Sequence, residues 1–170
     1  MPRKTAAAPQ LSGDRNLDQS ELRKHPGYFL ARARFVAFRA FDEHIGEVFQ
    51  LRPVEFALMV LLSSNREVTQ AQLSKALGVA PSNMTGVVRR LEARNLLKRT
   101  RADSDRRLQC VTLTTAGAKL LRQAVAAGAG MDTGWLGILS NAEQAMLVEL
   151  LEKVALAGPV AARRLRAEIG

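Results

Sequence analysis

The sequence predicts a mainly α-helical chain with one small β-hairpin, and three observations support this fold class. The chain has 170 residues, a length that allows one domain or one domain with an extension, and its hydrophobic content of 47% excludes wholesale disorder. From residue 26 onward, apolar residues recur at steps of three or four, the period of a helix that packs on one face. The exception is the segment 97–113, where two short runs, alternating or β-branched, flank a turn-rich stretch, as in a hairpin.

The N-terminal part is predicted to contain a tail and two helices. Residues 1–20 carry prolines and scattered charges without an apolar period, which predicts a mobile tail. A helical pattern runs from Pro26 to Phe49 and contains six of the eight aromatic residues. Pro53 fits the first position of a second helix, which continues to Ser64.

A tight turn between two short helices is the central feature of the sequence. Thr69 and Gln72 form a capping box that opens a helix ending near Gly78, a residue suited to the left-handed position past a helix end. Pro81 then starts a helix that runs to Asn95. The order helix, helix, short helix, turn, helix, basic hairpin is that of a winged helix-turn-helix.

The C-terminal part is predicted to be helical, with one weak stretch. Thr114 caps a helix that begins at Thr115 and reaches the Ala-rich segment near Ala127. Four glycines between residues 128 and 137 make the next stretch a poor helix former. A second capping box at 140–143 opens a last helix, with Pro159 as a candidate break before a basic end.

The first turn of the helix at Pro81 offers short polar side chains to DNA. In a helix-turn-helix the second helix lies in the major groove, with its first residues on base edges. Asn83 can form a paired hydrogen bond with adenine, and the hydroxyls of Ser82 and Thr85 can reach bases or phosphates. The predicted DNA contacts of this helix are Pro81, Ser82, Asn83, Met84, Thr85, Arg89 and Arg90. The alternative is an ordinary helix N-terminus, where Ser, Asn and Thr are common.

The charge distribution favours the nucleic-acid interpretation. With 25 Lys and Arg against 16 Asp and Glu, the chain carries a formal net charge of +9, which favours polyanionic partners. Residues 81–107 contain eight basic and three acidic residues, so more than half of the excess lies in this segment. A solvated surface is the alternative, but such surfaces usually mix both signs, whereas a basic helix followed by a basic hairpin fits phosphate neutralisation.

Three motifs within residues 51–117 carry a resemblance to a known family. The hairpin contains Asp105-x-Arg107-x-x-x-Val111-x-Leu113-Thr114, followed by Gly117. It is supported by Leu73-Ser-Lys-Ala-Leu-Gly78-Val79 and by Arg90-Leu91-Glu92-x-x-Asn95-Leu96. With these motifs the chain resembles the MarR-family transcriptional regulators. The flanking helices match that family's architecture by position only.

The resemblance implies a homodimer that binds double-stranded DNA. It assigns residues 21–50 to an N-terminal dimerisation helix, 51–117 to the winged helix-turn-helix and 118–170 to C-terminal dimerisation helices. Arg107 matches the arginine that enters a minor groove, and Asp105 matches the acidic residue that holds the wing tip by ion pairing. The wing contacts implied in this way are Arg99, Arg101, Asp105, Arg106 and Arg107. Arg52 stands where the family usually has a small hydroxyl residue, which predicts a weaker helix cap.

Members of this family often bind small aromatic acids or thioesters between the first helix, the second helix and the helix after the wing. In this chain, arginines lie among aromatic residues on the first helix, a composition that suits an anionic aromatic ligand. The pocket residues suggested by this pattern are Tyr28, Arg32, Phe35, Phe38 and Arg39. The alternative is that this aromatic stripe only forms the core of the dimer.

Other functional classes find no support in the sequence. His25 and His44 are 19 positions apart, so a shared local metal site is not expected, and no motif indicates catalysis or a cofactor. The longest apolar run, residues 56–62, is too short for a membrane span, and the N-terminus lacks a signal-peptide core. A cytoplasmic location is therefore expected. Cys110 is the single cysteine, and its place on the strand face opposite Val111 predicts partial exposure.

These patterns predict a ligand-responsive transcriptional regulator. We expect a repressor that binds a pseudo-palindromic operator as a homodimer and is released by a small anionic effector. A constitutive or architectural DNA-binding protein without an effector is the main alternative, and an enzyme is a distant third.

Overall fold

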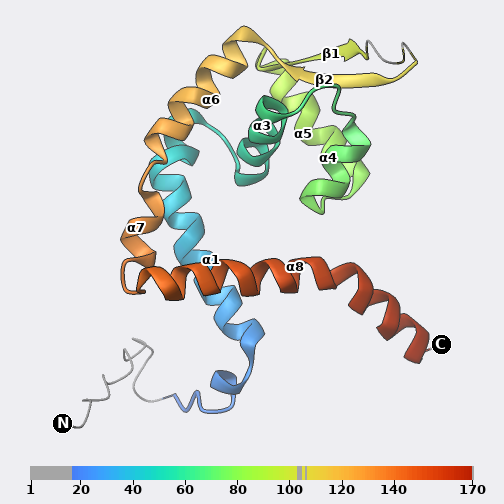
Figure 1. Cartoon of the computed structure of the whole chain (residues 1–170). Coiled ribbons are helices and arrows are strands. Elements are labelled where there is room, and N and C mark those ends of the chain that lie inside the picture. Colours follow the sequence, from blue (N-terminus) through green and yellow to red (C-terminus); the bar gives the residue numbers. More distant parts are fainter. Residues whose placement is uncertain (1–16, 103–104, 106, 170) are drawn as a thin grey trace. The chain divides into compact units, whose positions relative to one another are not determined.

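The computed structural model describes residues 17–102, 105 and 107–169, with side chains described as far as residue 157. The chain divides into two compact units, residues 1–36 and 37–170, and each is described by itself. Figure 1 shows the helices and strands, which are η1 (Leu22–Lys24), α1 (Pro26–Phe41), η2 (Asp42–Gly46), α2 (Glu47–Phe49), α3 (Pro53–Ser64), α4 (Gln70–Leu77), α5 (Pro81–Ala93), β1 (Leu97–Arg101), β2 (Gln109–Leu113), α6 (Thr115–Ala127), α7 (Met131–Leu136) and α8 (Asn141–Ile169). The predicted N-terminal tail lies almost entirely outside the described residues.

The predicted helix starts at Thr69 and Thr114 are confirmed by their capping contacts. The backbone N–H of Gln72 donates to Oγ1 of Thr69 (3.3 Å), and that of Gly117 donates to Oγ1 of Thr114 (3.0 Å). The N-cap of α3 is different, because the side chain of Arg52 offers no acceptor. Its backbone N–H instead donates to the carboxylate of Glu55 (2.9 Å), which supplies one half of a capping box.

The long N-terminal helix differs from its prediction as a single regular helix from Pro26 to Phe49. It changes to a π-helical turn at η2 and resumes as α2, which ends at Gln50 with a φ of 53°. An apolar period of three to four residues cannot reveal one widened turn. The turn places Phe41 and Ile45 in the core of the unit 37–170.

The hairpin is confirmed, and it pairs Leu97 with Leu113 and Arg101 with Gln109 in antiparallel register. The segment before α4 adds a third extended piece, because the N–H of Val111 donates to the carbonyl of Val68 (2.9 Å). This piece also forms a bridge with Cys110, which is 1% exposed. The prediction of a partly exposed cysteine is therefore wrong, since the strand face opposite Val111 is covered as well.

The core of the unit 37–170 forms where α3, α5 and α6 meet the hairpin. Its fully buried members include Leu58, Met59, Leu73, Val88 and Leu91. Met84 belongs to the same cluster and is 0% exposed. Met84, Val88 and Leu91 lie on the side of α5 that packs in the core, so only the other side of α5 is open to a partner.

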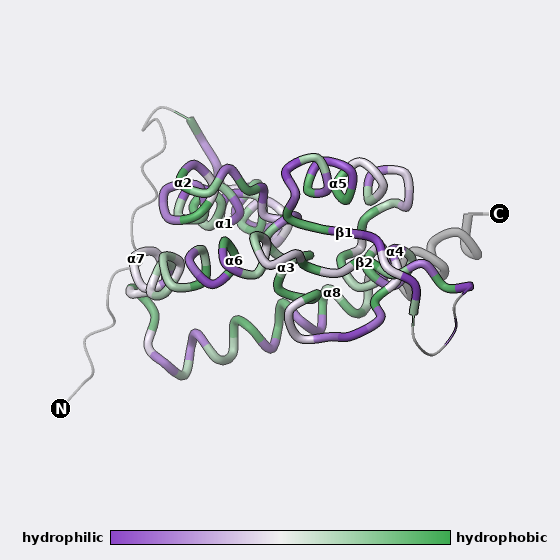
Figure 2. The backbone as a smooth tube through the Cα atoms, turned by 90° about the horizontal axis from the view of Figure 1, so that it is seen from above, coloured by the Kyte–Doolittle hydropathy of each residue, from purple (hydrophilic) through white to green (hydrophobic). Residues whose placement is uncertain are grey.

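The C-terminal part follows its prediction in part. The glycine-rich stretch contains only the six-residue helix α7, but α8 continues through Pro159, so the candidate break is wrong. A proline in a helix removes one hydrogen bond, and the turns on both sides can still form. Apolar residues recur along α8 between polar ones, as Figure 2 shows by colour.

Candidate nucleic-acid interface

A tight turn joins α4 and α5 into a helix-turn-helix. Gly78 ends α4 with a φ of 62°, a left-handed conformation that glycine adopts without strain. The backbone N–H of Val79 donates to the carbonyl of Ser74 (3.0 Å). Across the pair, Nε2 of Gln70 donates to Oγ1 of Thr85 (2.7 Å). The turn and this hydrogen bond fix the direction in which α5 leaves α4.

The first turn of α5 presents three of its predicted contact residues to solvent. Pro81, Ser82 and Asn83 are exposed. Thr85 is half-buried, and its hydroxyl donates to the carbonyl of Pro81 (3.0 Å), so it serves mainly the helix-turn-helix itself. Met84 is wrong as a predicted DNA contact, because its fully buried side chain packs under the helix and cannot reach a base.

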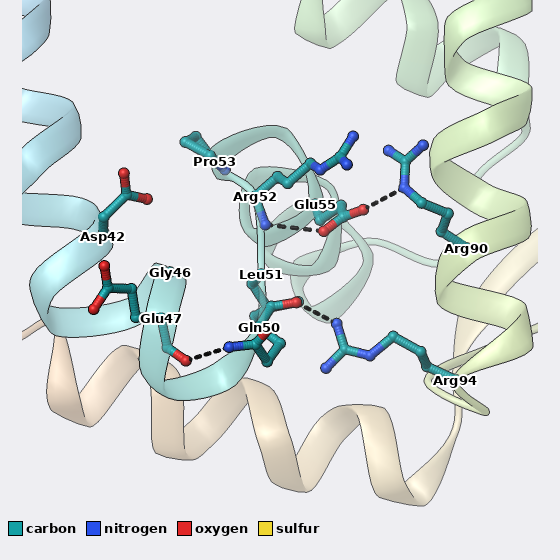
Figure 3. A pocket seen from close by; sticks show the side chains of 10 residues that line it. All are labelled: Asp42, Gly46, Glu47, Gln50, Leu51, Arg52, Pro53, Glu55, Arg90 and Arg94. Carbon is teal, nitrogen blue, oxygen red and sulfur yellow. Dashed lines mark hydrogen bonds and ion pairs between the residues drawn. The ribbon is translucent and has the colours of Figure 1, made fainter.

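The two adjacent arginines of α5 have different environments. Arg89 is exposed, and no partner for its guanidinium is found among the described residues. Nε of Arg90 lies 2.9 Å from Oε1 of Glu55, whose side chain is only 5% exposed (Figure 3). Arg90 therefore neutralises a buried carboxylate of α3. Sequence reasoning did not find Glu55, although its place three residues after Arg52 is the usual place for a capping carboxylate.

Arg94, just past α5, also has a structural role. It donates from Nη2 to the carbonyl of Phe49 (2.9 Å) and from Nη1 to that of Gln50, which ends α2. Together with Arg52 and Arg90 it lines an open cavity of about 600 Å³, shown in Figure 3. Arg90 and Arg94 thus attach α5 and the residue after it to α3 and to the end of α2.

The arginines of the hairpin also divide into two kinds. Arg99 is held by Glu92 (Nε–Oε1, 2.8 Å) and donates to Gln109 (3.1 Å), which ties β1 to α5. Arg101 is exposed near the end of β1. At the hairpin tip, the backbone N–H of Arg107 donates to Oδ1 of Asp105 (2.9 Å), and the Arg107 side chain is exposed. Arg106 lies outside the described residues.

The predicted pocket residues of α1 fall into both units. In the first unit, Nη1 of Arg32 donates to the hydroxyl of Tyr28 (2.9 Å), and Phe35 is 79% exposed. In the second unit, Phe38 is 42% exposed. Arg39 pairs with Glu43 (2.8 Å), and this hydrogen bond, with the attraction between the two charges, raises the pKa of Arg39.

A largely apolar cavity of about 790 Å³ lies between α3, β2 and α6. Its apolar walls include Leu62, Leu113, Leu121 and Val125, and Arg122 is the one cationic residue among the described residues that line it. An apolar cavity with a single cation at its side suits an aromatic carboxylate. The family resemblance placed a ligand near α3 and α6, but sequence reasoning named none of these wall residues, because they come from three elements far apart in the chain.

Comparison with known proteins agrees with this geometry. The family model described as "MarR family" matches residues 51–108. The transcriptional regulator HosA of Escherichia coli O157:H7 is 30% identical over 108 residues, which cover 64% of this chain and 80% of HosA. The chain belongs to the MarR family. It is a transcriptional regulator of the MarR type, as the sequence motifs predicted.

Two solved structures of the repressor CouR are similar to this MarR-family chain. One is bound to a 23-mer DNA duplex, with a TM-score of 0.75 and 30% identity, covering 82% of this chain and 98% of CouR. The other is bound to p-coumaroyl-CoA, with a TM-score of 0.74 and 28% identity, covering 82% and 97%. The predicted winged helix-turn-helix fold is thereby confirmed.

The described part of this MarR-family chain lacks the features of a metal centre and of a membrane span. No group of three or more His, Cys, Asp or Glu side chains there could hold a metal ion. No helix there is long and apolar enough to cross a membrane.

Proposed function

We propose that this MarR-family protein is a ligand-responsive repressor that binds a pseudo-palindromic operator as a homodimer. The observation that carries the proposal is the exposed side of the helix-turn-helix and wing. Ser82 and Asn83 stand at the start of α5, and Arg89, Arg101 and Arg107 have exposed guanidinium groups that no described residue binds. Short polar side chains suit base edges, while free arginines suit phosphates and a narrow minor groove.

A homodimer is supported by the apolar residues that the chain leaves exposed. Monomeric soluble proteins rarely expose large contiguous apolar patches, whereas two helices of this chain carry large exposed apolar side chains close together in the sequence. On α1 they are Phe29, Leu30, Phe35 and Val36, and on α8 they are Met146, Val148, Leu150, Leu151, Val154 and Leu156. We propose residues 21–50 and 118–170 as the dimerisation segments, with residues 51–117 as the DNA-binding region. Sedimentation should give a dimer, and a folded monomer at micromolar concentration would contradict the proposal.

The test of DNA binding begins with operator fragments selected from genomic DNA by the purified protein. Arg107→Ala should weaken binding to these fragments without changing the fold. It should also lower the slope of log affinity against log salt concentration by about one. Arg23→Ala is the matched control, since Arg23 is exposed on η1, outside the proposed DNA surface. Equal operator affinities of wild type and Arg107→Ala at two salt concentrations would refute the wing assignment.

The proposed effector is a small anionic aromatic compound, an acid or a thioester. CouR binds p-coumaroyl-CoA, and the cavity between α3, β2 and α6 offers apolar walls beside Arg122. Tyr28, Arg32, Phe35, Phe38 and Arg39 remain a separate proposal for residues that contact the effector. Such a ligand weakens operator binding only if it prefers the DNA-incompetent form of the dimer.

Gel-shift titrations with a panel of aromatic acids and their thioesters test the effector. In wild type, at least one compound should weaken the operator complex, by 5- to 150-fold for a coupling of about 1–3 kcal/mol. Arg122→Gln should remove the effect if the cavity is the site, and Arg32→Gln/Arg39→Gln should do so if α1 supplies the cation. If no compound acts on wild type, a constitutive DNA-binding protein becomes the better description.

A further inference from the structure

A strongly cationic cavity lies between the hairpin and the segment that joins α3 to α4. It measures about 830 Å³, within the range of about 300–1,000 Å³ that is usual for small-molecule sites. Its described lining includes three cationic residues, Arg66, Lys98 and Arg101, and one acidic residue, Glu67. The three cationic side chains are exposed, and none has a hydrogen-bond or ion-pair partner among the described residues. The cavity therefore carries an excess of two positive charges that no contact of the described fold uses.

Backbone hydrogen bonds fix the elements that carry these cations. Lys98 and Thr112 are directly paired across the hairpin, so their side chains lie on the same face of it. The strand β2 also holds the segment that carries Arg66, because the N–H of Val111 donates to the carbonyl of Val68 (2.9 Å). The cationic residues therefore line one cavity because the backbone places them there, and a ligand would not have to order them.

Two further features of the lining are unusual. Glu67 has a φ of 52°, in the left-handed region that few residues other than glycine adopt. Oγ1 of Thr112 is buried and makes no hydrogen bond within the described structure. Backbone outliers gather at ligand sites, and buried hydroxyls normally have a partner. Both features are independent of the charges, and both mark this wall as a candidate for ligand binding.

We infer that this cavity binds a free small molecule with a diphosphate group, such as pyrophosphate or a nucleoside diphosphate. A diphosphate presents two adjacent anionic groups, which Arg66 and Arg101 can bind through paired N–H donors and Lys98 as a point charge. The hydroxyl of Thr112 can donate to a phosphate oxygen after rotation to another staggered rotamer. A monoanion would leave part of the charge excess of two unneutralised, so a diphosphate fits the cavity better.

Operator DNA is the other source of phosphate groups that these cations could meet, and the position of Thr112 argues against it. The phosphates of a duplex lie on a broad convex surface, so they reach side chains at the mouth of a cavity rather than a hydroxyl in its wall. A small anion can enter the cavity itself. The inference goes beyond the proposed function, because it requires neither operator DNA nor the aromatic effector and concerns a different cavity.

Calorimetric titration and thermal unfolding of the full chain without DNA test this site. The probes are inorganic pyrophosphate and ADP, with sulfate at equal ionic strength as the control for general screening. Pyrophosphate at about 100 times its Kd should raise Tm by about 5–10 °C, and sulfate should not. Arg66→Gln/Lys98→Gln should weaken pyrophosphate binding at least about tenfold. Arg23→Gln/Lys119→Gln removes the same charge outside the cavity and should leave the Kd unchanged. Thr112→Val should weaken pyrophosphate binding severalfold.

Tighter binding of ADP than of pyrophosphate identifies a nucleotide as the ligand, and equal binding identifies the diphosphate group alone; both results support the inference. It is overturned if wild type binds neither probe at millimolar concentration, if the double variant binds pyrophosphate as tightly as wild type, or if sulfate raises Tm as much as pyrophosphate does. If the double variant loses operator affinity while wild type binds no diphosphate, Arg66 and Lys98 serve DNA instead. The inference is then wrong and the proposed function stands.

Discussion

The same substitution should have different effects at the adjacent residues Arg89 and Arg90. At Arg90 it should lower the stability of the fold, and at Arg89 it should weaken operator binding. Glu55 is 4% exposed, and its carboxylate contacts Nε of Arg90 and the backbone N–H of Arg52, both at 2.9 Å. Arg90→Gln removes the cation from this carboxylate. Breaking a buried ion pair costs about 3–5 kcal/mol. Because the Arg90 side chain is 43% exposed, water replaces part of the lost interaction, and we expect a loss of about 2 kcal/mol.

Urea and thermal unfolding of the two variants measure this difference. A loss of about 2 kcal/mol corresponds to a fall in Tm of about 4–8 °C for a chain of this size. Arg89→Gln should leave the free energy of unfolding within about 0.5 kcal/mol of wild type, since Arg89 is exposed and contacts no described partner. It should instead weaken operator binding, because it removes a free cation from the proposed DNA surface.

A double-mutant cycle with Glu55→Gln isolates the pair from other effects of the two substitutions. In the Arg90→Gln background, Glu55→Gln should recover part of the lost stability, because a neutral amide is less costly to bury without a cation. If Arg89→Gln and Arg90→Gln destabilise the fold equally, or if the coupling energy of the cycle is near zero, our reasoning about Arg90 is refuted.

Contacts elsewhere in the chain predict three further outcomes. Gly117→Ala should destabilise the fold by about 2 kcal/mol or more in urea unfolding, because its Cβ would overlap the carbonyl oxygen of Leu96. Hydrogen bonds from Ser140 lower the pKa of Glu143, so the capping box that these two residues form stabilises α8 at neutral pH. This stabilisation is lost as the pH falls through the lowered pKa. Amide exchange in the first turn of α8, corrected for intrinsic rates, should then accelerate. Cys110 is 1% exposed and should react with a thiol reagent only after unfolding, so immediate labelling of the native protein would contradict its burial.

Local sequence signals predicted most of the winged helix because each element carries its own chemistry. Thr69 and Gln72 mark the start of α4, Gly78 marks its end, and Pro81 starts α5, all at the predicted positions. Thr114 likewise predicted the start of α6. These signals act within one turn of a helix, so a single sequence is sufficient to find them.

Features that depend on packing between elements could not be predicted in the same way. Met84 lies at a position where a base contact is plausible, and only the contacts of α5 with the core show that it is buried. The burial of Cys110 depends on the segment before α4, which lies about 40 residues earlier in the sequence. The cavities also depend on distant elements, since α3, β2 and α6 each contribute a wall. The periodicity of one element does not contain this information.

The basic segment between residues 81 and 107 illustrates how one charge pattern serves two purposes. Arg90, Arg94 and Arg99 are bound by groups of the protein itself and hold α5 to α3, α2 and β1. We expect these cations to add little to phosphate binding, because their partners already neutralise or occupy them. The guanidinium groups of Arg89 and Arg107 have no partner among the described residues. Their positions depend on where α5 and the hairpin lie, and the bound arginines fix those two elements. If a ligand in the cavity between α3, β2 and α6 displaced α3, the ion pair between Glu55 and Arg90 would transmit this movement to α5.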